Sequence, residues 1–181
     1  QKLENHQVMA TKKIYLYPVW IRMWHLLNAV MILLLIWTGV SMRYSAGQGL
    51  LSFEAAAGIH NVAAIIVTIN YGIFLIFNIV TRNGRYYKKW RQNLATNLWK
   101  QFLFYAVGIF RKEPHPFPIN EEQKFNPLQK FSYVIVMYLC MPLLILSGLG
   151  LMFPELIAYE IFNLSGLLFY DLVHIILGFV I

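Results

Sequence analysis

The sequence is poor in charge and nearly without cysteine. Only 13% of its 181 residues are Asp, Glu, Lys or Arg, whereas 59% are hydrophobic, and a soluble domain has about 25% charged residues. Its single cysteine, Cys140, lies in an apolar run, which excludes a disulfide framework and a cysteine-based metal cluster. We expect this thiol to behave as a small buried hydrophobic group. No segment has the polar balance of a soluble domain, so the composition indicates an integral membrane protein.

Long apolar runs are what the sequence has instead. They cover about residues 19–42, 55–80 and 131–153, and a fourth begins near 167 and continues to 181. Each of the first three exceeds the roughly 20 residues that a helix needs to cross the hydrocarbon core. The fourth is too short to cross at about 1.5 Å per residue, so we predict a fourth helix that is truncated at the chain end. The predicted fold is one all-α domain over residues 1–181, a transmembrane four-helix bundle.

Basic residues gather on one side of this predicted bundle. If the spans alternate in direction, the N-terminal segment and the 81–130 loop lie on the same side. They carry every Lys and Arg except Arg43. The opposite side carries Arg43 together with the acids Glu54, Glu155, Glu160 and Asp171. The positive-inside rule therefore predicts a cytoplasmic N-terminus and a cytoplasmic 81–130 loop. Within this loop, residues 97–110 are predicted to form an amphipathic helix at the membrane interface. The net charge of +7 is then explained by contact with the lipid bilayer. No nucleic-acid partner is expected.

Three of the five histidines, His25, His60 and His174, lie inside apolar runs. An ionisable side chain in the hydrocarbon region requires a partner, which makes it a candidate functional residue. His60 and His174 are each five to seven residues from the outer ends of inward-going helices. His25 is about seven residues from the inner end of the first helix. Two imidazoles thus share one depth, and the third lies at a level about 15–20 Å away.

Two histidines at one depth on different helices are the arrangement that holds a haem between helices. A small residue follows each histidine by four positions, on the same helical face: Ala29, Ala64 and Gly178. This leaves room for a flat porphyrin. His25 would need a partner at the inner level, where the rest of the fourth helix would lie.

These histidines have other possible roles. A buried neutral histidine can simply bond to a neighbouring helix. Zinc or copper would need clustered ligands with cysteine or carboxylate nearby, and a proton pathway would need acids within the spans. A transporter would have helices broken at central Gly or Pro, and only Pro142 is so placed. Haem b accounts for the pattern best.

Two similar stretches, WTGVSM (37–42) and LSGLGLM (146–152), lie near the outer ends of the first and third spans. They are either the record of an old duplication or, the interpretation we favour, small residues where helices cross closely.

Four motifs in order, RMWHLLNAVMILLLIWTGVSM, GIHN, KFNPLQKFSY and DLVHIILG, resemble the di-haem cytochrome b subunits of bacterial respiratory complexes. These are the gamma subunit of formate dehydrogenase, the cytochrome b of membrane nickel–iron hydrogenase and thiosulfate reductase cytochrome b, within the broad cytochrome b561 superfamily. The resemblance covers almost the whole chain.

The resemblance implies two haem b groups. It implies His60 and His174 as ligands of the outer haem and His25 as one ligand of the inner haem, whose second ligand would fall beyond Ile181. The family's quinone site has an N-x-G-Q-K motif, which corresponds to Asn126, Gln129 and Lys130 here, with Leu128 in place of the glycine. Asn126 would bond a quinone carbonyl, and Lys130 or Arg22 would stabilise semiquinone charge or a haem propionate. Interfacial snorkelling is the alternative for both cations.

The implied function is that of a quinone-reactive cytochrome b subunit of an oxidoreductase in the bacterial inner membrane. Electrons would pass between a periplasmic-facing iron–sulfur or multihaem subunit and menaquinone or ubiquinone. The long cytoplasmic loop favours this membership of a hetero-oligomeric complex. The alternatives are a stand-alone cytochrome b561-type quinone oxidoreductase and a haem-free structural anchor.

Overall fold

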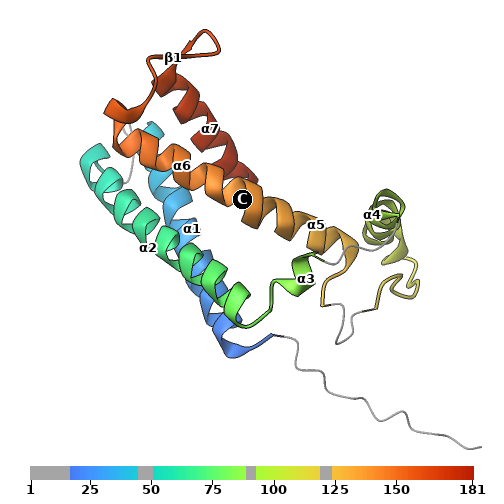
Figure 1. The fold of residues 1–181 in the computed structure, drawn as a ribbon. Helices are drawn as coiled ribbons and strands as arrows, with labels where there is room; N and C mark the ends of the chain where they lie inside the picture. Colours follow the sequence, from blue (N-terminus) through green and yellow to red (C-terminus); the bar gives the residue numbers. More distant parts are fainter. Residues whose placement is uncertain (1–16, 45–50, 89–92, 119–123) are drawn as a thin grey trace, which may run out of the picture.

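Long apolar helices dominate the computed structural model, which describes residues 17–44, 51–88, 93–118 and 124–181 (Figure 1). Helix α1 covers Val19–Tyr44 and α2 covers Phe53–Val80. A third apolar helix runs continuously over Pro127–Met152, and the shorter α7 covers Gly166–Val180. The predicted helical membrane bundle is confirmed. Most of the basic N-terminal segment lies outside the described residues.

The helices form two pairs. Helix α1 packs along α2, and α7 packs along α6, the last part of the third apolar helix (Met141–Met152). The two pairs lie together at the end that carries β1 and diverge towards the end that carries α3 (Figure 1). The short segments η3 (Pro154–Leu156), β1 (Glu160–Ile161) and β2 (Leu164–Ser165) connect α6 to α7. Strands β1 and β2 pair antiparallel through a turn in which Phe162 and Asn163 both have positive φ, at 50° and 61°, as in a type I′ hairpin.

Most of the bundle surface is apolar, as lipid requires. Leu33 of α1, Ile79 of α2 and Leu146 of α6 are each more than half exposed. Buried polar groups instead pair between helices. Asn70 of α2 donates from Nδ2 to Asn28 Oδ1 at 2.9 Å, and the indole Nε1 of Trp24 donates to the Asn70 carbonyl at 3.0 Å. With no water in the hydrocarbon region, such groups stabilise the bundle only when they find one another.

The third apolar helix has a π-helical segment in its middle. It begins as α5 (Pro127–Ile135), continues as η2 (Val136–Cys140) and ends as α6. In η2 the amide of Met141 donates to the Val136 carbonyl, one residue further back than in an α-helix. The next residue is Pro142, which has no N–H to donate. The widened turn and the proline together deprive the Met137 carbonyl of its usual helical donor.

Smaller elements lie at the α3 end of the bundle. Helix α3 covers Arg85–Lys88, α4 covers Leu94–Leu103, and the π-helical η1 continues α4 over Phe104–Gly108. Together α4 and η1 occupy most of the interval expected to form an amphipathic helix. Helix α4 packs on α5 and lies apart from α1 and α2 (Figure 1).

Candidate functional site

Two histidine side chains from different helix pairs face each other. The ring of His60 on α2 and the ring of His174 on α7 have centroids 6.2 Å apart, with an interplanar angle of 64°. Both helices begin at the same end of the bundle with a serine cap. Ser52 Oγ accepts from the amide of Ala55, and Ser165 Oγ accepts from that of Leu168. Each histidine lies about two turns after its helix start, so the caps set the two rings at one depth.

Each histidine is also bonded to the other helix of its own pair. Thr38 Oγ1 of α1 lies 2.9 Å from His60 Nδ1, and Ser147 Oγ of α6 lies 3.0 Å from His174 Nδ1. The threonine hydroxyl donates to the Leu34 carbonyl at 2.8 Å, and the serine hydroxyl donates to the Leu144 carbonyl at 3.0 Å.

These bonds are compatible with one particular tautomer of both rings. A hydroxyl has one proton, and a carbonyl can only accept. When each hydroxyl donates its proton to the helix carbonyl, its oxygen accepts from the imidazole, and the ring proton is then on Nδ1. The lone pair of His60 and of His174 is then on Nε2, the nitrogen across the ring. A metal ligand requires this neutral form, oriented by a bond through its other nitrogen.

A glycine follows each hydroxyl residue and gives the ring its space. A Cβ built on Gly39 would lie 3.6 Å from Cε1 of His60. A Cβ built on Gly148 would lie 3.0 Å from Cε1 of His174. Beyond His174, a Cβ on Gly178 would meet nothing within 4 Å, so the neighbouring turn of α7 leaves open space.

The two rings fit the axial ligands of a haem. A metal–imidazole bond of about 2 Å on each side of an iron puts the ring centroids roughly 6 Å apart, and His60 and His174 are 6.2 Å apart. Among the described residues, no group of three or more His, Cys, Asp or Glu side chains is placed to hold a bare metal ion. A porphyrin supplies four equatorial nitrogens, so two protein ligands suffice.

His25 lies far from this pair, towards the opposite end of α1. It is exposed, and its ring stacks beside that of its neighbour Trp24, with centroids 6.4 Å apart. Thirteen residues separate it from Thr38, which corresponds to about 20 Å along the helix axis. The structure therefore brings His60 and His174 together and leaves His25 at a separate level.

The predicted quinone residues lie at the start of α5. Asn126 is the N-cap: its Oδ1 accepts from the amide of Gln129 at 2.8 Å, and its own amide donates to Gln129 Oε1 at 3.3 Å. Its Nδ2 donates to the hydroxyl of Tyr105 at 2.8 Å. Lys130 is buried, only 9% exposed. Arg22 is exposed at the start of α1, where its Nε donates to the Tyr17 carbonyl at 3.0 Å.

Three residues of these sites were not predicted from the sequence: Thr38, Ser147 and Tyr105. The similar stretches WTGVSM and LSGLGLM did contain the first two. The structure shows that what these stretches share, a hydroxyl residue followed by glycine, lies against a histidine in both helix pairs. Tyr105 lies in an apolar run, and nothing in the sequence marked its hydroxyl as part of a site.

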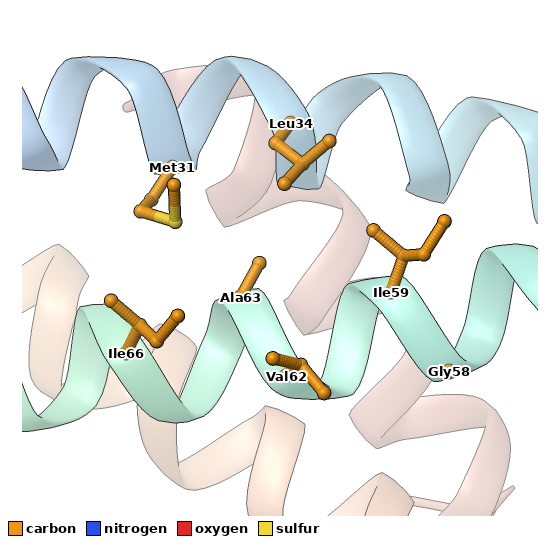
Figure 2. A pocket seen from close by; sticks show the side chains of 7 residues that line it. All are labelled: Met31, Leu34, Gly58, Ile59, Val62, Ala63 and Ile66. Carbon is orange, nitrogen blue, oxygen red and sulfur yellow. The ribbon is translucent and has the colours of Figure 1, made fainter.

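A groove of about 300 Å³ lies between α1 and α2 (Figure 2). Met31 and Leu34 point into it from α1, and Ile59 and Ala63 point back from α2. All of its lining side chains are apolar. It offers no hydrogen bond to a polar ligand and suits a hydrocarbon chain.

Comparisons with known proteins show which family the chain belongs to. Over 144 residues the chain is 38% identical to the Escherichia coli (strain K12) protein named "Putative cytochrome YdhU". The aligned region is 80% of this chain and 55% of that protein, so the chain spans about half the length of this relative. No solved structure matches. The family described as prokaryotic cytochrome b561 matches residues 16–181. The chain therefore belongs to the prokaryotic cytochrome b561 family, membrane-embedded proteins that bind haem b and transfer electrons.

Proposed function

We propose that His60 and His174 are the two axial ligands of a haem b at the outer level of the bundle. One observation carries this proposal: the two rings face each other at 6.2 Å, each with Nδ1 bonded to a hydroxyl and Nε2 left to bind a metal. A histidine that served only packing would need no matched partner at its own depth.

A haem bound there supplies reversible one-electron transfer through its iron. The chain's own residues hold and orient the two imidazoles and enclose them in apolar surface. Thr38 and Ser147 keep the ring protons on Nδ1. Met141 and Val67 belong to the buried hydrophobic core of the bundle.

We propose His25 as a ligand of a second haem at the inner level. The family resemblance supports this. The axial separation of about 20 Å between His25 and Thr38 is too large for one haem. Two haems would carry electrons across the bilayer in two steps.

A quinone site near the start of α5 is the proposed cytoplasmic end of this path, for menaquinone or ubiquinone. We assign the buried side chain of Lys130 and the hydroxyl of Tyr105 to this site. The side-chain amide of Asn126 is engaged on both its atoms. We therefore assign Asn126 to holding Tyr105, with Gln129 completing the cap. Arg22 lies at the same end of the bundle and would pair with a haem propionate.

We propose that the chain is the membrane subunit of an inner-membrane respiratory oxidoreductase with its N-terminus in the cytoplasm. The β1–β2 end would then face the periplasm. It carries Glu155, Glu160 and Asp171, and Tyr159 and Phe162 are almost fully exposed there, at 95% and 86%. A surface of this kind suits an iron–sulfur or multihaem partner. A stand-alone quinone oxidoreductase is the competing function, and it predicts purification without any redox partner.

The test is a reduced-minus-oxidised spectrum with haem quantitation on the purified full-length protein. We expect two haems b per chain, with His60→Ala and His174→Ala losing the same one and His25→Ala losing the other. His115→Ala is the matched control, because His115 is exposed in the loop, and it should retain both. A folded His60→Ala variant with the wild-type haem content and spectrum would overturn the assignment.

A further inference from the structure

We infer that Thr38 and Ser147 are positioning residues for the two histidine ligands. We also infer that Gly39 and Gly148 help to position the same two rings. Each helix pair presents a hydroxyl to Nδ1 of a histidine and a glycine next to Cε1 of its ring. This inference rests on the proposed function, since it describes how His60 and His174 are prepared for a haem.

Burial makes both hydroxyls dependent on protein partners. Thr38 is 0% exposed and Ser147 is 4% exposed. Each donates to a carbonyl of its own helix and also lies within hydrogen-bond distance of Nδ1 of the histidine. With the single hydroxyl proton donated to the carbonyl, the hydroxyl oxygen accepts from Nδ1–H of the ring. Both imidazoles are thereby held as the tautomer that exposes a lone pair on Nε2.

Bonding of a hydroxyl back to its own helix is common in this bundle, and it does not by itself indicate a function. Ser41 donates to the Trp37 carbonyl, and Thr68 donates to the Ala64 carbonyl, both at 2.8 Å. Neither of these hydroxyls meets a histidine in the described part of the chain. Thr38 and Ser147 differ because each is also within hydrogen-bond distance of a ring nitrogen.

The glycines set how closely each ring approaches its helix. Gly148 lies closer to its ring than Gly39 does, since an added Cβ would be 3.0 Å from His174 Cε1 but 3.6 Å from His60 Cε1. The first distance forces the ring to move by a few tenths of an ångström, whereas the second is ordinary van der Waals contact. The two positions therefore respond unequally to the same substitution.

The bond to Nδ1 also affects the iron. An acceptor at Nδ1 makes the imidazole a stronger donor through Nε2, which favours the ferric state. Replacing Thr38 by valine keeps the shape of the side chain and removes the acceptor. The midpoint potential of the outer haem should then rise, and the orientation of the ring about its iron bond should become less fixed.

The experiment compares Thr38→Val and Ser147→Ala with wild type in the full-length, haem-loaded protein. The readouts are the electron paramagnetic resonance g values of the ferric low-spin haems and a potentiometric titration of each haem. We expect both variants to retain haem, to shift the g values and to raise the potential of the outer haem alone. Ser41→Ala is the control, because Ser41 is a buried hydroxyl on the same helix that does not meet a ring; it should match wild type. Thr38→Ser keeps a hydroxyl at this position and should therefore keep the wild-type g values and potential.

Outcomes separate this inference from the proposed function. If His60→Ala and His174→Ala leave the haem spectrum unchanged, the proposed function fails. If those variants lose haem but Thr38→Val and Ser147→Ala keep wild-type g values and potentials, only the positioning role fails. If Thr38→Val does not fold, the positioning role is tested by the smaller change Ser147→Ala and by comparing Gly148→Ala with Gly39→Ala. A positioning role requires Gly148→Ala to shift the g values more than Gly39→Ala does. Equal g values in the two variants would overturn this role.

Discussion

Tyr71 on α2 donates its hydroxyl proton to the main-chain carbonyl of Met137, 2.7 Å away in the π-helical segment η2. This carbonyl lacks a helical donor because the Met141 amide bonds to Val136 instead and because Pro142 has no N–H. Tyr71 is buried, and its bond joins the α1–α2 pair to the third apolar helix. A side chain of one helix thus repairs the main-chain bonding of another, which is how broken helices are tolerated in lipid.

Tyr71→Phe should destabilise the protein by about 1–3 kcal/mol, since it leaves a buried carbonyl without a partner. The measurement is the free energy of unfolding in mixed micelles with increasing dodecyl sulfate, followed by circular dichroism. Tyr138→Phe is the matched control, because Tyr138 lies in the same π-helical segment and is 44% exposed. Equal stability of the two variants would show that Tyr71 contributes packing alone.

Pro142→Ala should reduce the cost of Tyr71→Phe. Alanine restores an N–H that can serve the carbonyls at the start of α6, so the Met137 carbonyl depends less on Tyr71. A double-mutant cycle of Tyr71→Phe with Pro142→Ala measures this coupling directly. Strictly additive free energies of unfolding would argue that the proline does not cause the missing bond.

The buried amides of Asn28 and Asn70 should be energetically coupled. Asn70 Nδ2 donates both to Asn28 Oδ1 at 2.9 Å and to the Trp24 carbonyl at 3.3 Å. Removing either amide leaves the other with a buried unpaired group, so each alanine variant should lose most of the shared contribution. We expect a coupling of about 0.5–2 kcal/mol in a double-mutant cycle, the range measured for interhelical bonds in membranes. Leu33→Ala, on the exposed face of α1, is a control that should show no coupling to Asn70→Ala.

The sequence predicted the helices well because lipid imposes a simple rule. A chain with no water to bond must be helical wherever it is apolar over about 20 residues. The depths of His60 and His174 followed from the fixed rise per residue. Counting from helix ends therefore placed them at one level without any knowledge of packing.

The partners of these histidines could not be predicted in the same way. Thr38 and Ser147 meet the rings only because of how α1 is rotated against α2 and α6 against α7. Sequence periodicity does not fix that rotation when a helix is apolar on all sides. The shared Thr-Gly and Ser-Gly pairs were visible, but close helix crossing explained them equally well.

The sequence that begins at Asn126 fits two different motifs. Asn-Pro-x-Gln resembles the family's quinone motif, and it also has the spacing of a capping box, with proline at the first helical position. The structure shows the capping box. Contact of Asn126 with a quinone stays a prediction, and the neighbouring hydroxyl of Tyr105 is the more available group.

If the proposed quinone site is correct, Tyr105→Phe should slow the reaction with quinone and leave the haem content unchanged. The Tyr105 oxygen accepts the Asn126 amide at 2.8 Å, so its own proton remains available to a quinone carbonyl. Losing one such bond costs about 0.5–1.5 kcal/mol, which corresponds to roughly a two- to tenfold fall in kcat/KM. The measurement is the rate of haem reduction by a soluble quinol analogue. Tyr133→Phe is the control, because Tyr133 is a 43% exposed tyrosine of α5. If Tyr105→Phe reacts at the wild-type rate, the site lies elsewhere and Tyr105 serves only the cap of α5.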